Sequence, residues 1–338
     1  MNKEKCTLDL YMKNIYIFPN VYMEEAEVMA KRSGIEYDIY YILRGDKYII
    51  NQYEEVDTCL KIEILNCSKK EKYFACFDVS TSFGVPNTTY LNITLKDNNS
   101  MLKIEYNYKG VSYIENNDIL IYEKYNEYTK GGKPFFWMFH AENLLDMQIK
   151  ANGMEYNREY EVLYIGQSKR KNIFDRLRNH STLQKIMRDN VRNETDKDIY
   201  LLVHSVGMHA YVNYDLKQYN TEILLGSTVS SINELENNIK QSDIVNIAEA
   251  LLILHFKPAY NEKLKKDCGL EKLSTYRRIG DTDINPIALS VDLYREESGE
   301  KMVLKTLQTE TKTKARVIQC YFDDEVEITY EDLPDFMY

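Results

Sequence analysis

Short runs in which apolar and polar residues alternate dominate the first 125 residues of the chain. The alternation is clear at residues 102–106 (LKIEY), where every second residue is apolar, as is typical of a strand with one solvated face. Turn-forming residues separate the runs, and residues 21–32 predict one helix that ends at Gly34. Strands are expected at residues 14–18, 37–43, 60–65, 73–79, 90–95, 102–108 and 119–122. Residues 1–125 should therefore form a β-sandwich or barrel, an all-β accessory domain with a recognition, structural or oligomerising role.

A second pattern, in which strand and helix signals alternate, covers residues 134–265 after a glycine-rich linker at residues 129–134. Asn172 is a suitable N-cap for a helix, and Pro258 ends a strongly apolar one. Residues 141–158 are expected to be irregular. Strands are expected at residues 135–140, 161–165 and 199–206, and helices at residues 172–190 and 243–256. The order β-β-α-β-α predicts one small mixed α/β domain.

Residues 270–338 are expected to form a small β-rich C-terminal extension with an acidic tail. Its strands are expected at residues 287–293, 302–307 and 315–322. The chain as a whole is thus predicted to be α+β, with a central mixed domain between two β-rich parts.

The composition places the chain among globular proteins of the cytoplasm. Its 338 residues, 44% of them apolar, are enough for two or three domains of roughly 100–200 residues each. No apolar run approaches the roughly 20 residues that span a bilayer, and residues 1–12 carry no export signal. The six cysteines form no C-x-x-C pair and are expected to be reduced thiols. We therefore expect no membrane partner.

The formal net charge of −10 excludes a protein coated in basic surface, but the charge is unevenly placed. Basic residues are concentrated between Ser168 and Lys197, where a local basic face can bind phosphates because charge is screened beyond about 10 Å. The acidic tail should instead repel DNA. The basic residues are Lys169, Arg170, Lys171, Arg176, Arg178, Lys185, Arg188, Arg192 and Lys197.

Three residues of the central segment could carry chemistry. Arg176 and His180 are four residues apart on the predicted helix and would share one face. A guanidinium group there can hold a phosphate and stabilise the charge that develops when phosphorus is attacked. Glu249 lies within an apolar helix, where a carboxylate is costly to bury unless it is paired or binds a metal. One carboxylate with waters and a substrate phosphate can hold Mg²⁺.

Taken together, these residues resemble the GIY-YIG nuclease family over residues 164–261. The resemblance is carried by Tyr164-Ile165-Gly166-Gln167-Ser168, by Arg176 and His180, by Glu249, and by Pro258-Ala259-Tyr260-Asn261. It implies that Tyr164 lines the site, that Arg176 contacts the scissile phosphate, and that His180 assists there. It also implies that Glu249 binds one Mg²⁺ or Mn²⁺ ion and that Asn261 supports the site. The implied reaction is hydrolysis of a DNA phosphodiester by metal-activated water, with a tyrosine or histidine as proton acceptor.

The sequence departs from the family at its start, because no Gly-Ile/Val-Tyr strand precedes Tyr164 at the usual short distance. With a longer connection, residues 135–137 could form that strand, and Trp137 would then replace the tyrosine. Tryptophan cannot act as a base. His140 or Tyr156 would have to substitute for it.

The sequence therefore predicts a metal-dependent DNA endonuclease of restriction, phage defence or a mobile element, with homodimerisation for duplex cleavage. Lys169, Arg170, Lys171 and Arg178 are the expected DNA-binding residues, and His140 is a supporting one. One alternative is a decayed nuclease domain that binds or senses nucleic acid. Another is a structural protein with an accidental motif match, which convergence of Arg176 and Glu249 would argue against.

Overall fold

The computed structural model describes residues 6–56, 59–78, 82, 90–107, 135–152, 156–168, 172–212, 239–262, 284–295, 300–307, 309, 315–322 and 326–333. The chain is mixed α+β and divides into two compact units. Unit 1 comprises Met1–Gly45 and Asn157–Tyr338, and unit 2 comprises Asp46–Tyr156. Each unit has hydrophobic clusters of its own.

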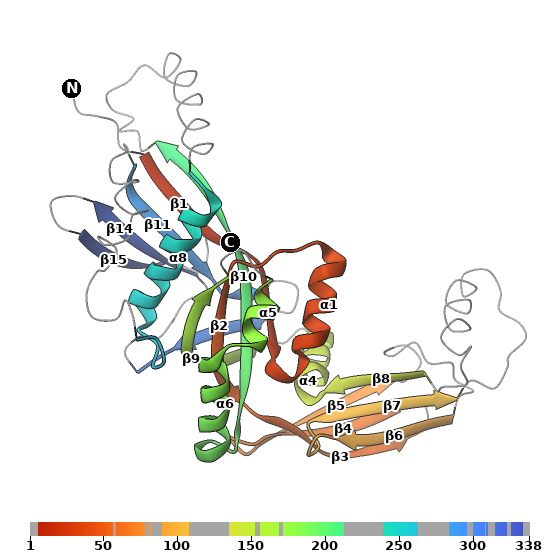
Figure 1. Ribbon diagram of the computed structural model, residues 1–338. Coiled ribbons are helices and arrows are strands. Elements are labelled where there is room, and N and C mark those ends of the chain that lie inside the picture. Colours follow the sequence, from red (N-terminus) through yellow and green to blue (C-terminus); the bar gives the residue numbers. More distant parts are fainter. Residues whose placement is uncertain are drawn as a thin grey trace, which may run out of the picture. The chain divides into compact units, whose positions relative to one another are not determined.

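Unit 1 is built on a nine-stranded sheet with the strand order β12-β13-β9-β2-β10-β1-β11-β14-β15. The sheet is mixed, because β1 pairs antiparallel with β10 and parallel with β11. Its strands are β1 (Cys6–Pro19), β2 (Ile39–Asp46), β9 (Tyr156–Gln167), β10 (Lys197–Val212), β11 (Ile284–Asp292), β12 (Tyr294–Arg295), β13 (Glu300–Lys305), β14 (Ala315–Phe322) and β15 (Val326–Leu333). Figure 1 labels seven of these strands, β2, β9, β10, β1, β11, β14 and β15, which come from distant parts of the chain.

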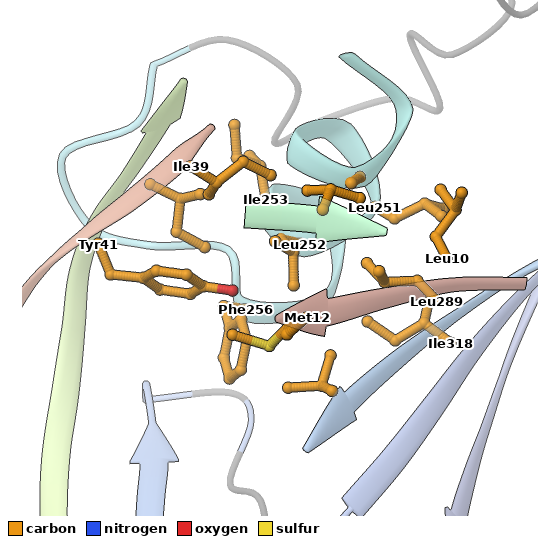
Figure 2. Close-up of a cluster of buried hydrophobic side chains, with 14 of the residues drawn as sticks. Leu10, Met12, Ile39, Tyr41, Leu251, Leu252, Ile253, Phe256, Leu289 and Ile318 are labelled. Carbon is orange, nitrogen blue, oxygen red and sulfur yellow. The ribbon is translucent and has the colours of Figure 1, made fainter. Parts of the chain in front are cut away.

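Helices cover both faces of this sheet (Figure 1). On one face α1 (Met23–Ser33), α5 (Ile173–Arg178) and α6 (Ser181–Asn193) pack against Tyr40 and Ile42 of β2. On the other face α8 (Gln241–Phe256) packs against Ile39, Tyr41 and Leu43 of the same strand. Figure 2 shows Leu252 and Phe256 of α8 against Tyr41 and Met12. Alternate residues of β2 thus serve two cores, as the two-residue repeat of a strand requires.

Unit 2 lies in the sequence between β2 and β9. It contains two three-stranded sheets, β3-β4-β5 and β6-β7-β8, and the helix α4 (Ala141–Ala151). Both sheets and α4 contribute to one hydrophobic cluster. The strands are β3 (Tyr48–Val56), β4 (Cys59–Asn66), β5 (Glu71–Asp78), β6 (Tyr90–Lys96), β7 (Met101–Asn107) and β8 (Phe135–His140).

The local predictions are largely confirmed. The helix expected at residues 21–32 is α1, and Gly34 ends it in the left-handed conformation, with φ of 64°. The prediction that residues 141–158 are irregular is wrong, because residues 141–151 form the helix α4. Buried Ala141, Leu144, Leu145 and Ile149 carry its helical spacing. The strand expected at residues 119–122 and the linker at residues 129–134 lie outside the described residues.

Strand pairing crosses the segment boundaries expected at residues 1–125, 134–265 and 270–338. Strands β1 and β2 pair with β10 and β9, and β11 pairs with β1. The first 45 residues therefore share a compact unit with β9, α5, α6, β10 and α8. None of the helices in the described part of the chain has the length and apolar character that crossing a bilayer requires.

Candidate active site

The expected site residues Tyr164, Arg176, His180 and Glu249 come from separate segments of unit 1 and lie near one another. Tyr164 lies on β9, Arg176 on α5, His180 between α5 and α6, and Glu249 on α8. The ring centroids of Tyr164 and His180 are 5.0 Å apart. Burial, followed by the negative charge of Glu249, raises the pKa of Tyr164. The pKa of Arg176 also responds to that carboxylate. The four side chains therefore share one electrostatic environment.

Tyr40 on β2 completes this cluster and was not identified from the sequence. Its ring stacks on that of Tyr164 with a centroid separation of 6.0 Å, and it meets the His180 ring edge-on at 5.7 Å. Its hydroxyl oxygen accepts a hydrogen bond from Arg176 Nε at 3.1 Å. Tyr40 is therefore in contact with three of the four expected residues.

The pairing of β2 with β9 explains this contact. Tyr40 is opposite Gly166 in the antiparallel register, and Ile39 is opposite Gln167. A Cβ atom at Gly166 would lie 2.5 Å from the Tyr40 hydroxyl oxygen, so glycine at this position makes room for the tyrosine. The Ile39-Tyr40 pair was the available signal. This pair was missed because the expected partner strand of β9 was residues 135–137, which are much closer to β9 in the sequence.

His180 is not on the helix that carries Arg176, which corrects the prediction of one helix over residues 172–190. Asn172 caps α5, and its side chain accepts a hydrogen bond from the Phe174 N–H. A short helix then ends at Arg178, and His180 caps α6 by accepting the Leu183 N–H at Nδ1, 3.2 Å away. The break turns the His180 ring toward the two tyrosines.

The cap fixes the protonation of His180. Burial, and then the positive charge of Arg176, lower its pKa. Because Nδ1 accepts the Leu183 N–H, the neutral ring carries its proton on Nε2. His180 therefore presents its Nε2–H as a hydrogen-bond donor.

Arg176 remains charged beside the tyrosines. Burial acts to lower its pKa, but the hydrogen bond to Tyr40 and the charges of Tyr40, Tyr164 and Glu249 outweigh it and raise the pKa. The guanidinium carbon lies 6.0 Å from the centroid of the Tyr40 ring. Arg176 therefore presents a permanent positive charge at the cluster.

The two tyrosines differ in their partners. Burial raises the pKa of both hydroxyl groups, and the negative charge of Glu249 adds to the rise at Tyr164. At Tyr164, the positive charge of Arg176 and the nearby Tyr40 hydroxyl oppose this rise. At Tyr40, the hydrogen bond from Arg176 Nε and the positive charge of Arg176 oppose the rise, while the nearby Tyr164 adds to it. Arg176 therefore favours the deprotonated form of both hydroxyl groups.

The Glu249 carboxylate accepts a hydrogen bond from the Gln167 side chain, which also donates to Asn246. Gln167 Nε2 donates to Glu249 Oε2 at 2.5 Å and to Asn246 Oδ1 at 2.8 Å. Gln167 is buried, whereas Glu249 and Asn246 are half-buried. A single half-buried carboxylate fits Mg²⁺ or Mn²⁺, which take one or two carboxylates together with waters and substrate phosphate. Within the described residues, no group of three or more His, Cys, Asp or Glu side chains forms a further metal site.

Asn261 supports the strand that carries Tyr164. Its Nδ2 donates to the Ile165 carbonyl at 2.8 Å, and its Oδ1 accepts the Ile165 N–H at 3.0 Å. The preceding residue, Tyr260, donates its N–H to the Leu163 carbonyl at 2.9 Å. The segment after α8 therefore pairs with β9 on both sides of Tyr164.

The other expected residues lie elsewhere. The strand of residues 135–137 is not the partner of β9, because β8 pairs with β7 and places Trp137 opposite Ile104. His140 lies in unit 2, where its Nδ1 accepts the Glu142 N–H at 3.4 Å. Arg178 pairs with Glu27 and with Asp175. Expected DNA-binding residues Lys169, Arg170 and Lys171, and the side chain of Tyr156, lie outside the described part of the chain.

Comparisons of the chain with protein-family models, with curated proteins and with solved structures found no match.

Proposed function

We propose that the chain is a divalent-metal-dependent endonuclease that hydrolyses DNA phosphodiester bonds, with a GIY-YIG-like nuclease domain in unit 1. The observation that carries the proposal is the meeting of Tyr40, Tyr164, Arg176, His180 and Glu249 at one place. These residues come from segments far apart in the sequence. An accidental match to a sequence motif gives no reason for such a meeting.

The contacts of Tyr40 support a specific reading of the missing first strand. In this proposal Asp38-Ile39-Tyr40 takes the place of the Gly-Ile/Val-Tyr strand, with aspartate where the family has glycine. The antiparallel pairing of β2 with β9 supports this assignment. Unit 2 would then be an insertion between the two strands that carry the tyrosines.

Each residue has a role that its contacts suggest. Arg176 would bind non-bridging oxygens of the scissile phosphate and stabilise the charge that builds up on them. His180 would donate its Nε2 hydrogen to the same group. Tyr164, in its deprotonated form, would take the proton of the attacking water, and the positive charge of Arg176 favours that form. Tyr40 would orient Tyr164 and Arg176.

Glu249 would hold the cation, with Gln167 fixing the orientation of its carboxylate. When bound, Mg²⁺ or Mn²⁺ at this position supplies positive charge to the phosphate and lowers the pKa of an attacking water. Burial and then the charge on Glu249 raise the pKa of Tyr164, so neutralising that carboxylate lowers this pKa and favours the deprotonated form, which can accept a proton.

A single site cuts one strand, so we propose that duplex cleavage uses a homodimer in a restriction, phage-defence or mobile-element setting. In this proposal Tyr40 supplies the tyrosine whose absence from the expected position motivated the decayed-nuclease alternative. That alternative becomes an outcome of the cleavage test.

The test is cleavage of supercoiled plasmid and of a random-sequence duplex library, with Mg²⁺, Mn²⁺ or EDTA. Glu249→Ala and Arg176→Ala are compared with Glu25→Ala and Arg32→Ala, which change exposed residues of α1. We expect metal-dependent cutting that both site variants lose and both controls retain. DNA binding without cutting in every variant would instead support a nucleic-acid-binding protein.

A further inference from the structure

We infer that the exposed side of α6 is a binding track for the phosphate backbone of duplex DNA next to the cleavage site. This inference rests on the proposed function. Helix α6 begins at His180 and buries Leu183, Ile186 and Asn190 against the sheet. Lys185, Arg188 and Arg192 are exposed and lie at i, i+3 and i+7, so they form one stripe on the outer side.

The three cations of the stripe have no ion pair within the described part of the chain, unlike Arg44 and Arg178 of the same unit. Arg44 pairs with Glu161 and Glu194, and Arg178 pairs with Glu27 and Asp175. No ion pair among the described residues of the chain includes Lys185, Arg188 or Arg192. A chain with a net charge of −10 has many carboxylates, yet these three cations have none within ion-pair distance in that part of the chain.

The one carboxylate of α6, Asp189, is hydrogen-bonded to a tyrosine and forms no ion pair among the described residues. Asp189 accepts a hydrogen bond from the Tyr260 hydroxyl at 2.7 Å. The Lys185 ammonium nitrogen lies over the same tyrosine ring, 5.6 Å from its centroid. Tyr260 precedes Asn261, which pairs with the strand of Tyr164. The first cation of the stripe is thus next to the segment that supports the site.

The position of the stripe fits the DNA that flanks a phosphate bound at Arg176. Along a helix that rises about 1.5 Å per residue, Arg192 is about 18 Å from His180. A DNA strand carries one phosphate per roughly 3.4 Å of axis, so this length matches about five nucleotides. Exposed Ser181 and Gln184 on the same helix add neutral groups that can donate to phosphate oxygens.

The test is the salt dependence of DNA binding by the full chain, measured without divalent metal so that no cleavage occurs. Fluorescence anisotropy with a labelled duplex of about 30 base pairs would compare the wild type with the triple variant Lys185→Gln, Arg188→Gln, Arg192→Gln. Glutamine keeps helix propensity close to that of lysine and arginine. The matched control is Lys13→Gln, Arg32→Gln, Lys240→Gln, which removes the same charge from exposed positions on other elements.

We expect the slope of log K against log salt to fall by about 0.9 for each phosphate that the protein no longer neutralises, and therefore by about 2.7 in the stripe variant. The control should keep the wild-type slope. Equal slopes in the stripe variant and the control would overturn the inference, and would leave the proposed function intact if the wild type cuts DNA. A wild type that neither binds nor cuts DNA would overturn both.

Discussion

Tyr40 and Tyr164 lie on paired strands and stack with their ring centroids 6.0 Å apart, although the whole of unit 2 separates them in the sequence. Arg176 donates to Tyr40, and its positive charge also acts on Tyr164. The N-terminal 45 residues therefore contribute a residue to the candidate site as well as strands to the sheet. Residues 164–261 contain four of the five side chains of the candidate site, and Tyr40 lies outside that range.

The two functions assigned to His180 can be separated by substitution. In His180→Asn the side chain can still cap α6 but lacks the Nε2 donor, so we expect thermal stability near that of the wild type and slower cleavage. His180→Ala removes the cap as well and should lose about 1 kcal/mol of stability. Thermal unfolding and cleavage rates of the two variants are the measurements. Equal stability losses in both would contradict the capping role.

Gln167 should affect metal affinity through Glu249. In Gln167→Leu the donor to Glu249 Oε2 is lost, and we expect the concentration of Mg²⁺ for half-maximal cleavage to rise about 10- to 100-fold. The maximal rate at saturating metal should change less. Gln52→Leu, in unit 2, is the control. A variant with unchanged metal dependence and a reduced maximal rate would place Gln167 in substrate binding instead.

His204 should make the fold sensitive to acid. It is fully buried, and burial lowers its pKa to about 4. An unfolded histidine titrates near 6.5, so the unfolded state binds the proton more readily between these values. Stability should be complete above about pH 6.5 and should fall by about 3 kcal/mol as the pH decreases to about 4.

The measurement is urea unfolding of the wild type and of His204→Gln at about pH 7, 6 and 5. Glutamine does not titrate, so its stability should decrease less over this interval. Parallel decreases in the two proteins would show that other groups cause the acid sensitivity.

Unit 1 should fold without unit 2. Its hydrophobic clusters contain residues of unit 1 only, and β2 and β9 pair as far as Arg44 and Glu161. Joining Gly45 to Asn157 through a short glycine-containing turn should give a protein with one cooperative thermal transition and retained near-ultraviolet circular dichroism. Loss of that transition would mean that unit 1 depends on unit 2 for stability.

The sequence was informative where local periodicity decides the structure. The strands β4, β6, β7 and β8, the helix α8, and α1 with its end at Gly34 all follow from alternation, helical spacing or a capping residue. The grouping of Arg176, His180 and Glu249 was expected only from a resemblance. That they lie near one another depends on the fold and required the structure.

The sequence was uninformative about long-range pairing. Alternation marks Ile39 and Tyr40 as part of a strand, but nothing local specifies that β9 is its partner. The break at His180 was missed for a related reason. The segment carries helix formers on both sides, and the capping use of the imidazole depends on the contact that its ring makes with Tyr40 and Tyr164.

The most direct test of the central claim compares Tyr40→Phe with Tyr41→Phe in single-turnover cleavage of DNA with Mg²⁺ or Mn²⁺. The two tyrosines are adjacent on β2 and both are buried, but Tyr40 accepts from Arg176, whereas the Tyr41 hydroxyl is without a hydrogen-bond partner among the described residues. We expect Tyr40→Phe to bind DNA normally and cut it about 100-fold more slowly, and Tyr41→Phe to cut at the wild-type rate. Equal rates for the wild type and Tyr40→Phe would contradict the five-residue site.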